Sequence, residues 1–241
     1  MKFYLGIHVA AWSYRISVPY MLSVRLVLKR KKLLKGNDWL LDSGGFSELK
    51  LHGCYKISED EYIECIKHLK PNYAFCQDWM CERQILKRTG KEVEEHQELT
   101  IKSYTSLRKK SYRILPVLQG YTPDDYINHI KMYKKHKVNL NQLFGLGSVC
   151  KRSRTEIPEI IIPRIRSFAP EIKIHAFGLK ITAFKKPVIV NNLYSADSMA
   201  WSYDGRFNYG ALRRTNSLAH ALIWRNKVLK EINKNYYYKI T

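Results

Sequence analysis

Short apolar runs, each ending in a polar residue or a glycine, recur along this chain. After an alternating stretch at residues 2–9, such runs occur at 39–46, 73–78, 114–120, 143–148 and 172–178. The intervals between them have the composition and periodicity of helices. We therefore interpret the runs as buried strands and the intervals as the helices that connect them.

Capping signals mark where several of these helices begin. Ser58 with Glu61 forms a capping box, and Pro123 follows Thr122 at the first helical position. Pro71 is expected to end the first of these helices. Further helices are predicted at 93–110, 158–168 and 217–233, the last with an apolar face of Leu218, Leu222, Ile223, Val228 and Leu229.

Alternating strands and helices predict a parallel sheet, and the number of units is nearer to a closed barrel than to an open, doubly wound sheet. The chain has 241 residues, which matches the size of one (β/α)₈ barrel. No linker or low-complexity segment interrupts the pattern. The expectation is an α/β protein with a single TIM-barrel domain over residues 1–241.

In such a barrel every strand brings its C-terminal residue to one common face. The strand ends that would converge there carry Asp42, Asp78, Gln119, Gly147, His175 and Asp197. Three carboxylates and a carboxamide beside a glycine suit a flat, hydrogen-bonding ligand such as a purine base. One Asp could attack an anomeric carbon while a second serves as acid and then as base.

Each of these residues also has a structural explanation. Asp42 could be a helix cap or a strand-end carboxylate, and Asp78 and Asp197 could cap the turns that follow them. Gln119 could satisfy a loop. A buried His175 is more often a hydrogen-bonded core residue than a catalyst, so it stays outside the predicted catalytic set. The predicted convergence is what favours a functional site.

The net charge of the chain indicates which class of partner it binds. Lys and Arg total 42 against 21 Asp and Glu, a formal net charge of +21. That excess favours a polyanionic partner, with nucleic acid ahead of a membrane surface. The alternative is that many lysines are simply solvated on helix faces. A free nucleoside as substrate would give no reason for this charge.

The cysteines and the N-terminal region indicate whether the protein is disulfide-bonded, metal-binding, secreted or membrane-spanning. Five cysteines, an odd number in a chain of this size, indicate reduced thiols. Cys76 and Cys81 lack the further ligands of a zinc site, so no metal and no cofactor are expected. No signal peptide and no run long enough to span a membrane are present, which predicts a soluble, cytoplasmic protein of a cell or of a virus-infected host cell.

Several motifs taken together resemble the tRNA-guanine transglycosylase superfamily, most of all its DpdA-type branch, which places 7-deazaguanines in DNA. The resemblance runs from about Asp42 to Arg206. It is carried by Asp42-Ser43-Gly44-Gly45-Phe46, Asp78, Pro116-Val117-Leu118-Gln119-Gly120, Gly145-Leu146-Gly147-Ser148-Val149-Cys150-Lys151-Arg152, His175-Ala176-Phe177-Gly178-Leu179 and Ser195-Ala196-Asp197-Ser198-Met199-Ala200-Trp201.

The resemblance implies a TIM barrel that breaks a guanine N-glycosidic bond and inserts a 7-deazaguanine such as preQ0. By that analogy Asp197 is the nucleophile on C1′ and Asp42 the general acid and base, while Asp78 reads the guanine edge. The substrate-binding set that follows is Ser43, Gly44, Phe46, Asp78, Gln119, Gly145, Gly147, Phe177 and Gly178.

Basic residues after two of the strand ends are predicted to hold the nucleic-acid backbone. They are Lys151, Arg152, Arg154, Arg206, Arg213 and Arg214, of which Arg206 matches a family position near the backbone. Aromatic residues in the same region could stack on bases: Trp201, Tyr203, Phe207 and Tyr209. For Trp201, packing in the core is an equal alternative.

One departure bears on the substrate. The tRNA-acting relatives carry a Cys-x-Cys-x₂-Cys zinc site after the nucleophile, but no cysteine follows Cys150 here. We therefore expect a barrel without the zinc-binding insertion that exchanges bases in DNA. The same exchange on tRNA and a non-catalytic nucleic-acid-binding barrel are the alternatives. The sequence leaves open which 7-deazaguanine enters and whether helper proteins take part.

Overall fold

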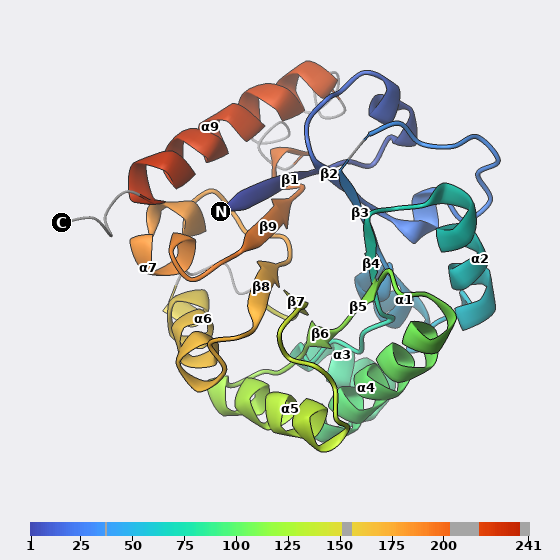
Figure 1. Ribbon diagram of the computed structural model, residues 1–241, viewed down its shortest axis with the longest axis vertical. Coiled ribbons are helices and arrows are strands. Elements are labelled where there is room, and N and C mark those ends of the chain that lie inside the picture. Colours follow the sequence, from blue (N-terminus) through green and yellow to red (C-terminus); the bar gives the residue numbers. More distant parts are fainter. Residues whose placement is uncertain (37, 151–155, 203–216, 237–241) are drawn as a thin grey trace.

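The computed structural model describes residues 1–36, 38–150, 156–202 and 217–236. Its parallel strands form a ring that helices surround, as Figure 1 shows from one end of the ring. The strands are β1 (Lys2–Gly6), β2 (Tyr20–Ser23), β3 (Trp39–Asp42), β4 (Tyr73–Phe75), β5 (Ile114–Leu115), β6 (Val117–Leu118), β7 (Leu143–Leu146), β8 (Lys173–Ala176) and β9 (Ser195–Ser198).

The ring closes through a break at Pro116. Within the described residues the sheet has nine strands in the order β5-β4-β3-β2-β1-β9-β8-β7-β6. Its two outer members, β5 and β6, are consecutive in the chain, so they act as one strand bent at Pro116. Proline has no N–H to donate to a strand ladder, but its carbonyl still accepts from Gly145 N at 2.9 Å. The prediction of a single (β/α)₈ barrel is confirmed.

The outer layer contains α1 (Gly45–His52), α2 (Glu59–Leu69), α3 (Arg83–Thr89), α4 (Val93–Lys110), α5 (Pro123–Lys135), α6 (Glu156–Phe168), α7 (Pro187–Val190) and α9 (Leu218–Tyr236), with short 3₁₀ helices η1 (Ala10–Tyr14), η2 (Val24–Leu26) and η3 (Ala183–Lys185). The predicted capping box is present at Ser58, and the predicted cap at Thr122, followed by Pro123, also forms a capping box, with Asp125. None of the described helices is both long and apolar enough to cross a membrane.

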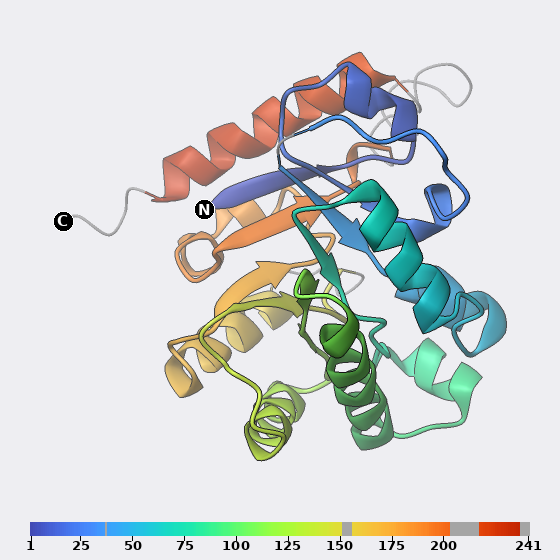
Figure 2. The ribbon, with the colours of Figure 1, turned by 45° about the vertical axis from the view of Figure 1, so that its right-hand side comes forward.

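Helix α9 lies across the outside of β1, as Figure 2 shows. Trp224 packs against Phe3 of β1, with ring centroids 6.1 Å apart. The buried face of the helix also includes Ala221, Val228 and Ile232 at helical spacing. Ile223 lies outside that stripe and is 57% exposed, so its predicted place in the apolar face was wrong.

Strand β2 was absent from the sequence prediction. It pairs in parallel with β1 and with β3, and Ser23 at its end lies beside Asp42 in the register. The segment that connects β1 to β2 contains η1 and no α-helix. The usual strand–helix–strand pattern is therefore missing at the first unit of the barrel, so the alternation of strands and helices did not mark β2.

Candidate active site

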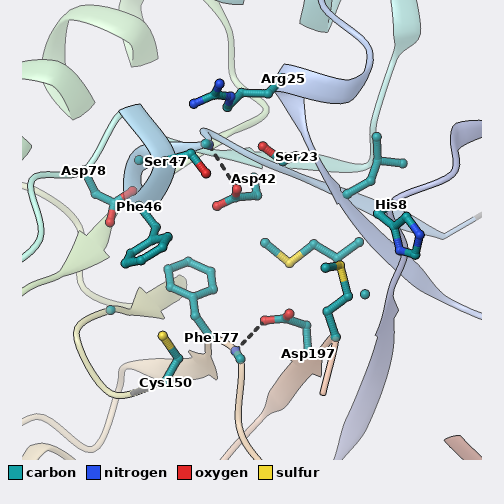
Figure 3. A pocket seen from close by; sticks show the side chains of 18 of the residues that line it. His8, Ser23, Arg25, Asp42, Phe46, Ser47, Asp78, Cys150, Phe177 and Asp197 are labelled. Carbon is teal, nitrogen blue, oxygen red and sulfur yellow. Dashed lines mark hydrogen bonds between the residues drawn. The ribbon is translucent and has the colours of Figure 1, made fainter. Parts of the chain in front are cut away.

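A pocket of about 420 Å³ lies at the C-terminal ends of the strands. Asp42, Asp78 and Asp197 line it from three different strand ends, and Figure 3 shows Phe46 and Phe177 in the space between Asp78 and Asp197. The predicted residues Gly44, Gly147 and Gly178 also line it. Segments from Gly6 to Met199 thus meet at one cavity, as the barrel topology predicts.

Asp42 ends β3, and its environment favours a proton. Gly44 N donates to Asp42 Oδ2 at 3.0 Å. Burial raises the pKa of Asp42 to about 7, and the charge of Asp78 acts in the same direction, while the Gly44 hydrogen bond opposes both. Asp197 adds a smaller contribution that also raises the pKa. A carboxyl group with a pKa near neutrality can both donate and accept a proton at physiological pH.

Asp78 follows β4 and is only 6% exposed. Its Oδ1 accepts from Ser43 Oγ at 3.0 Å, and its Oδ2 accepts from Gln119 Nε2. Burial raises the pKa of Asp78 to about 6, and the hydrogen bonds from Ser43 and Gln119 limit that rise. Both carboxylate oxygens are therefore held in place before any ligand enters.

The Gln119 amide is itself oriented by Ser148. Ser148 Oγ donates to Gln119 Oε1 at 2.6 Å, which directs the amide nitrogen toward Asp78. The same hydroxyl accepts from Cys81 N at 2.8 Å. Ser148 has a φ of 56°, a left-handed conformation that a non-glycine residue rarely adopts and that often marks a functional site. Ser43 and Gln119 thus contact the Asp78 carboxylate directly, and Ser148 supports it through Gln119.

Two glycines are required by close packing behind the pocket wall. A Cβ at Gly147 would overlap the Gln119 amide, and one at Gly145 would lie 2.5 Å from Cζ of Phe177. Ser43, Gln119 and Gly145 lie in this second layer and do not line the pocket itself. They set the positions of Asp78 and Phe177, which do.

Asp197 is the third residue of β9, and its side chain is 14% exposed. Its Oδ1 accepts from Gly178 N at 3.1 Å, the hydrogen bond drawn in Figure 3. In that view Asp42 and Asp197 lie on opposite sides of the central space. Two carboxylates in different surroundings across one cavity are suited to divided roles, one for protons and one for covalent attack.

Among the pocket residues that escaped the sequence prediction are three polar ones near the ends of β1 and β2: His8, Ser23 and Arg25. His8 follows β1, and the other two belong to β2 and η2. Arg25 lies 3.2 Å from Glu48, whose side chain is 4% exposed and whose Oε2 accepts from Lys56 N at 2.7 Å. This ion pair fixes a cation at the pocket wall. The apolar run before Ser23 was the signal that could have revealed β2 and, with it, Arg25.

Trp201 does not present its ring to a ligand. It is fully buried, donates from Nε1 to Gly6 O at 2.8 Å and stacks on His8 with centroids 5.2 Å apart. Of its two predicted roles, core packing is therefore the correct one. The other predicted stacking residues and the basic set lie outside the described residues: Tyr203, Phe207, Tyr209, Lys151, Arg152, Arg154, Arg206, Arg213 and Arg214.

Within the described residues no group of three or more His, Cys, Asp or Glu side chains could hold a metal ion. The family model of DpdA, described as DeoxyPurine in DNA protein A, matches residues 1–240. The chain belongs to the DpdA family. Membership in this family implies a transglycosylase with DNA as its substrate. No curated protein matches the chain.

Proposed function

We propose that this DpdA-family protein exchanges guanine in DNA for a 7-deazaguanine base such as preQ0, through a covalent aspartyl-glycosyl intermediate on Asp197. The observation that carries the proposal is the pairing of Asp42 and Asp197 across one pocket. Asp42 has its pKa raised to about 7 by burial, and Asp197 has one oxygen held by Gly178 N. The first suits proton transfer and the second suits nucleophilic attack.

In the first half-reaction Oδ2 of Asp197 attacks C1′ of the target nucleotide. The C1′–N9 bond breaks, its electron pair goes to the departing guanine, and that base takes a proton from Asp42. In the second half-reaction the incoming base gives its N9 proton to the Asp42 carboxylate. N9 then attacks C1′ and displaces Asp197, which returns to a free carboxylate. Asp42 thus acts first as acid and then as base.

The base pocket is proposed to select guanine-like rings through Asp78. Guanine presents two neighbouring donors, N1–H and the 2-amino group, and a carboxylate can accept both. Adenine presents an acceptor at N1, which would face the carboxylate unfavourably. Phe46 and Phe177, which both line the pocket, would pack on the two faces of the ring. A 7-deazaguanine shares the guanine donor edge, so the same pocket can take the leaving and the entering base.

DNA reaches such a pocket only when the target nucleotide leaves the base stack. That costs a few kcal/mol, which stacking and hydrogen bonds in the pocket offset. The net charge of +21 supports a backbone-binding surface around the mouth. We assign that contact to Lys151, Arg152, Arg154, Arg206, Arg213 and Arg214.

The direct test is incorporation of labelled guanine and labelled preQ0 into DNA and, separately, into unmodified tRNA by the purified protein. Asp197→Ala should abolish incorporation and leave DNA binding intact. Asp60→Asn is the matched control, because Asp60 is a carboxylate of α2 whose side chain is 85% exposed. This variant should incorporate label at the wild-type rate. A covalent protein–DNA adduct that survives denaturation and is missing from Asp197→Ala would identify the intermediate.

The outcomes distinguish the alternatives. Label in DNA alone would establish the proposed exchange, and label in tRNA alone would replace DNA by tRNA as the substrate. Label in neither, with no Asp197-dependent adduct, would leave a non-catalytic nucleic-acid-binding barrel. Equal incorporation by wild type and Asp197→Ala would remove Asp197 from the role of nucleophile.

A further inference from the structure

We propose that His175 is a positioning residue for Asp197: its Nε2–H holds Asp197 Oδ1, and the Ser195 hydroxyl fixes the imidazole tautomer that makes this contact favourable. The inference rests on the proposed function, because it assigns a role in the chemistry of Asp197. It uses a residue that sequence reasoning placed in the core.

The three side chains meet because of the register between β8 and β9. His175 lies directly beside Ser195 in the parallel pairing, and Asp197 lies two residues further along β9, so it points to the same face as Ser195. His175 Nδ1 is 2.9 Å from Ser195 Oγ, and Nε2 is 3.4 Å from Asp197 Oδ1. One imidazole thus bridges two residues of the neighbouring strand.

The surroundings hold this ring in one orientation. His175 is fully buried, stacks on Phe75 with centroids 5.1 Å apart and meets Phe177 edge-on at 5.3 Å. Within the described part of the chain, Nε2 has no hydrogen-bond partner at normal distance. A buried N–H without a partner is costly, and the oxygen that it faces is Asp197 Oδ1. Hydrogen bonds of catalytic groups are often long in an empty site and shorten when substrate binds.

The chemistry of the groups fixes the direction of each hydrogen bond. A neutral imidazole has one donor and one acceptor nitrogen. If Nδ1 carried the proton, the lone pair of Nε2 would face the Asp197 carboxylate, and the two would repel each other. If the Ser195 hydroxyl donates to Nδ1, the proton lies on Nε2 and points at Asp197. The second arrangement satisfies all three groups.

The arrangement divides the two oxygens of Asp197 between two tasks. Oδ1 is held by Gly178 N–H and faces His175 Nε2–H, which leaves Oδ2 to attack C1′. In the glycosyl-aspartate ester Oδ1 becomes the carbonyl oxygen. When the entering N9 bonds to C1′, the C1′–Oδ2 bond breaks and its electron pair returns to the carboxylate. The donors at Oδ1 hold the carboxylate so that Oδ2 points toward C1′, and loss of one donor lets the carboxylate turn away from the geometry needed for attack.

A pair of substitutions separates hydrogen bonding from packing. His175→Gln keeps an N–H₂ group near the position of Nε2, whereas His175→Phe fills the apolar space beside Phe75 and has no donor. We expect His175→Phe to slow adduct formation in a single turnover by about 100-fold, the effect that a misplacement of the attacking atom by about 1 Å can have. His175→Gln should recover about tenfold of that loss. KM for the free base should change less than twofold in both variants.

Tyr4→Phe is the matched control, because Tyr4 packs at 5.8 Å from the His175 ring but donates its hydroxyl to Asp38. It should form the adduct at the wild-type rate. A His175→Phe variant at least as fast as His175→Gln would overturn the inference, since a packing role predicts that order. Wild-type protein that forms no adduct would overturn the proposed function and this inference together, whereas adduct in wild type and His175→Phe alike would overturn only the inference.

The tautomer can be measured without turnover. ¹⁵N NMR of imidazole-labelled protein should find His175 protonated at Nε2 and not at Nδ1. Ser195→Ala should remove this preference, and its rate of adduct formation should lie between those of wild type and His175→Phe. A wild-type His175 protonated at Nδ1 would contradict the proposal regardless of how the variants fold.

Discussion

The hydroxyl of Ser43 donates a hydrogen bond to Oδ1 of Asp78 at 3.0 Å. A residue that follows β3 therefore fixes a carboxylate that follows β4, and the Gln119 amide fixes the other oxygen of the same carboxylate. Each oxygen keeps a lone pair that a ligand can use. Asp78, the proposed recognition group, is thus preorganised by neighbours that do not themselves line the pocket, and preorganisation lowers the entropy lost when a ligand binds.

Asp78→Asn should weaken recognition of guanine. The change replaces one acceptor oxygen by an N–H₂ donor, which would face a donor of the base or of Gln119 and leave buried groups unpaired. We expect kcat/KM for the free base to fall by at least about 100-fold, mostly through KM. Steady-state exchange at varied base concentration measures it. Ser43→Ala removes one hydrogen bond to the Asp78 carboxylate and should lower kcat/KM for the free base by less than tenfold. An equal fall in kcat/KM in both variants would contradict this role of Asp78.

The two half-reactions should depend on pH in opposite directions. Burial raises the pKa of Asp42 to about 7, so the group is protonated below that pH and ionised above it. Single-turnover formation of the adduct needs the protonated form and should slow as pH rises from 6 to 9 through about 7. Insertion of base into a preformed adduct needs the carboxylate and should accelerate over the same range. Parallel pH profiles for the two steps would exclude Asp42 as the shared acid and base.

Asp42→Asn should stabilise the protein at high pH while abolishing exchange. The folded-state pKa of about 7 lies above the ordinary value of 3.8, so the folded protein binds this proton more tightly than the unfolded chain. The stability contribution of Asp42 therefore falls as pH rises from about 4 to about 7, by up to about 4 kcal/mol. An asparagine at position 42 does not ionise, so the variant keeps its stability as the pH rises. Calorimetry should find a Tm several degrees above wild type at pH 8 and a smaller difference at pH 5; a lower Tm at pH 8 would contradict it.

Gly145→Ala should impair base binding through Phe177. The new Cβ would lie 2.5 Å from Cζ of that ring, so the ring must move. We expect KM for the free base to rise at least tenfold with unchanged DNA affinity. Gly53→Ala is the matched control, because its φ of +70° strains an alanine by about 1 kcal/mol at a position that does not line the pocket. The control should lower Tm and leave KM unchanged, and a KM effect of similar size in both variants would contradict the assignment.

The double variant Arg213→Ala with Arg214→Ala should weaken DNA binding and flatten its dependence on salt. Each phosphate contact that is lost reduces the slope of log K against log salt concentration by about one. Titrations at several salt concentrations measure that slope. Lys134→Ala with Lys135→Ala on α5 removes the same charge and should leave the slope unchanged. An unaltered slope in the arginine variant would place the phosphate path elsewhere.

The sequence predicted those parts of the fold that depend on local signals. The capping box at Ser58, the cap at Thr122 and the span of α4 depend on residues close to each other in the chain, and all three predictions are confirmed. The convergence of Asp42, Asp78 and Asp197 followed from the rule that parallel strands in a barrel end at one face. Periodicity and topology together were sufficient for this much.

Features that depend on pairing between distant segments were missed. Strand β2 has no α-helix before it, so the strand–helix rhythm did not mark it, and Arg25 was missed with it. Ile223 lies one position away from the buried stripe of α9, a distinction that only the packing against β1 decides. The approach of His175 to Asp197 depends on the register of β8 and β9, which hydrophobic pattern alone does not define.

The pairing of β1 with β9 also has a consequence for how the protein is made. Lys2 of β1 is translated before its partner Ser195 of β9, and the residues of all the other strands lie between them in the chain. One edge of β1 therefore stays unpaired until β9 has been synthesised, and ring closure has to wait for β9. Asp197, the proposed nucleophile, lies on β9. Under the proposed mechanism, a nascent chain carries Asp42 and Asp78 before it carries the group that attacks the sugar, so glycosidic bonds break only after β9 has joined the barrel.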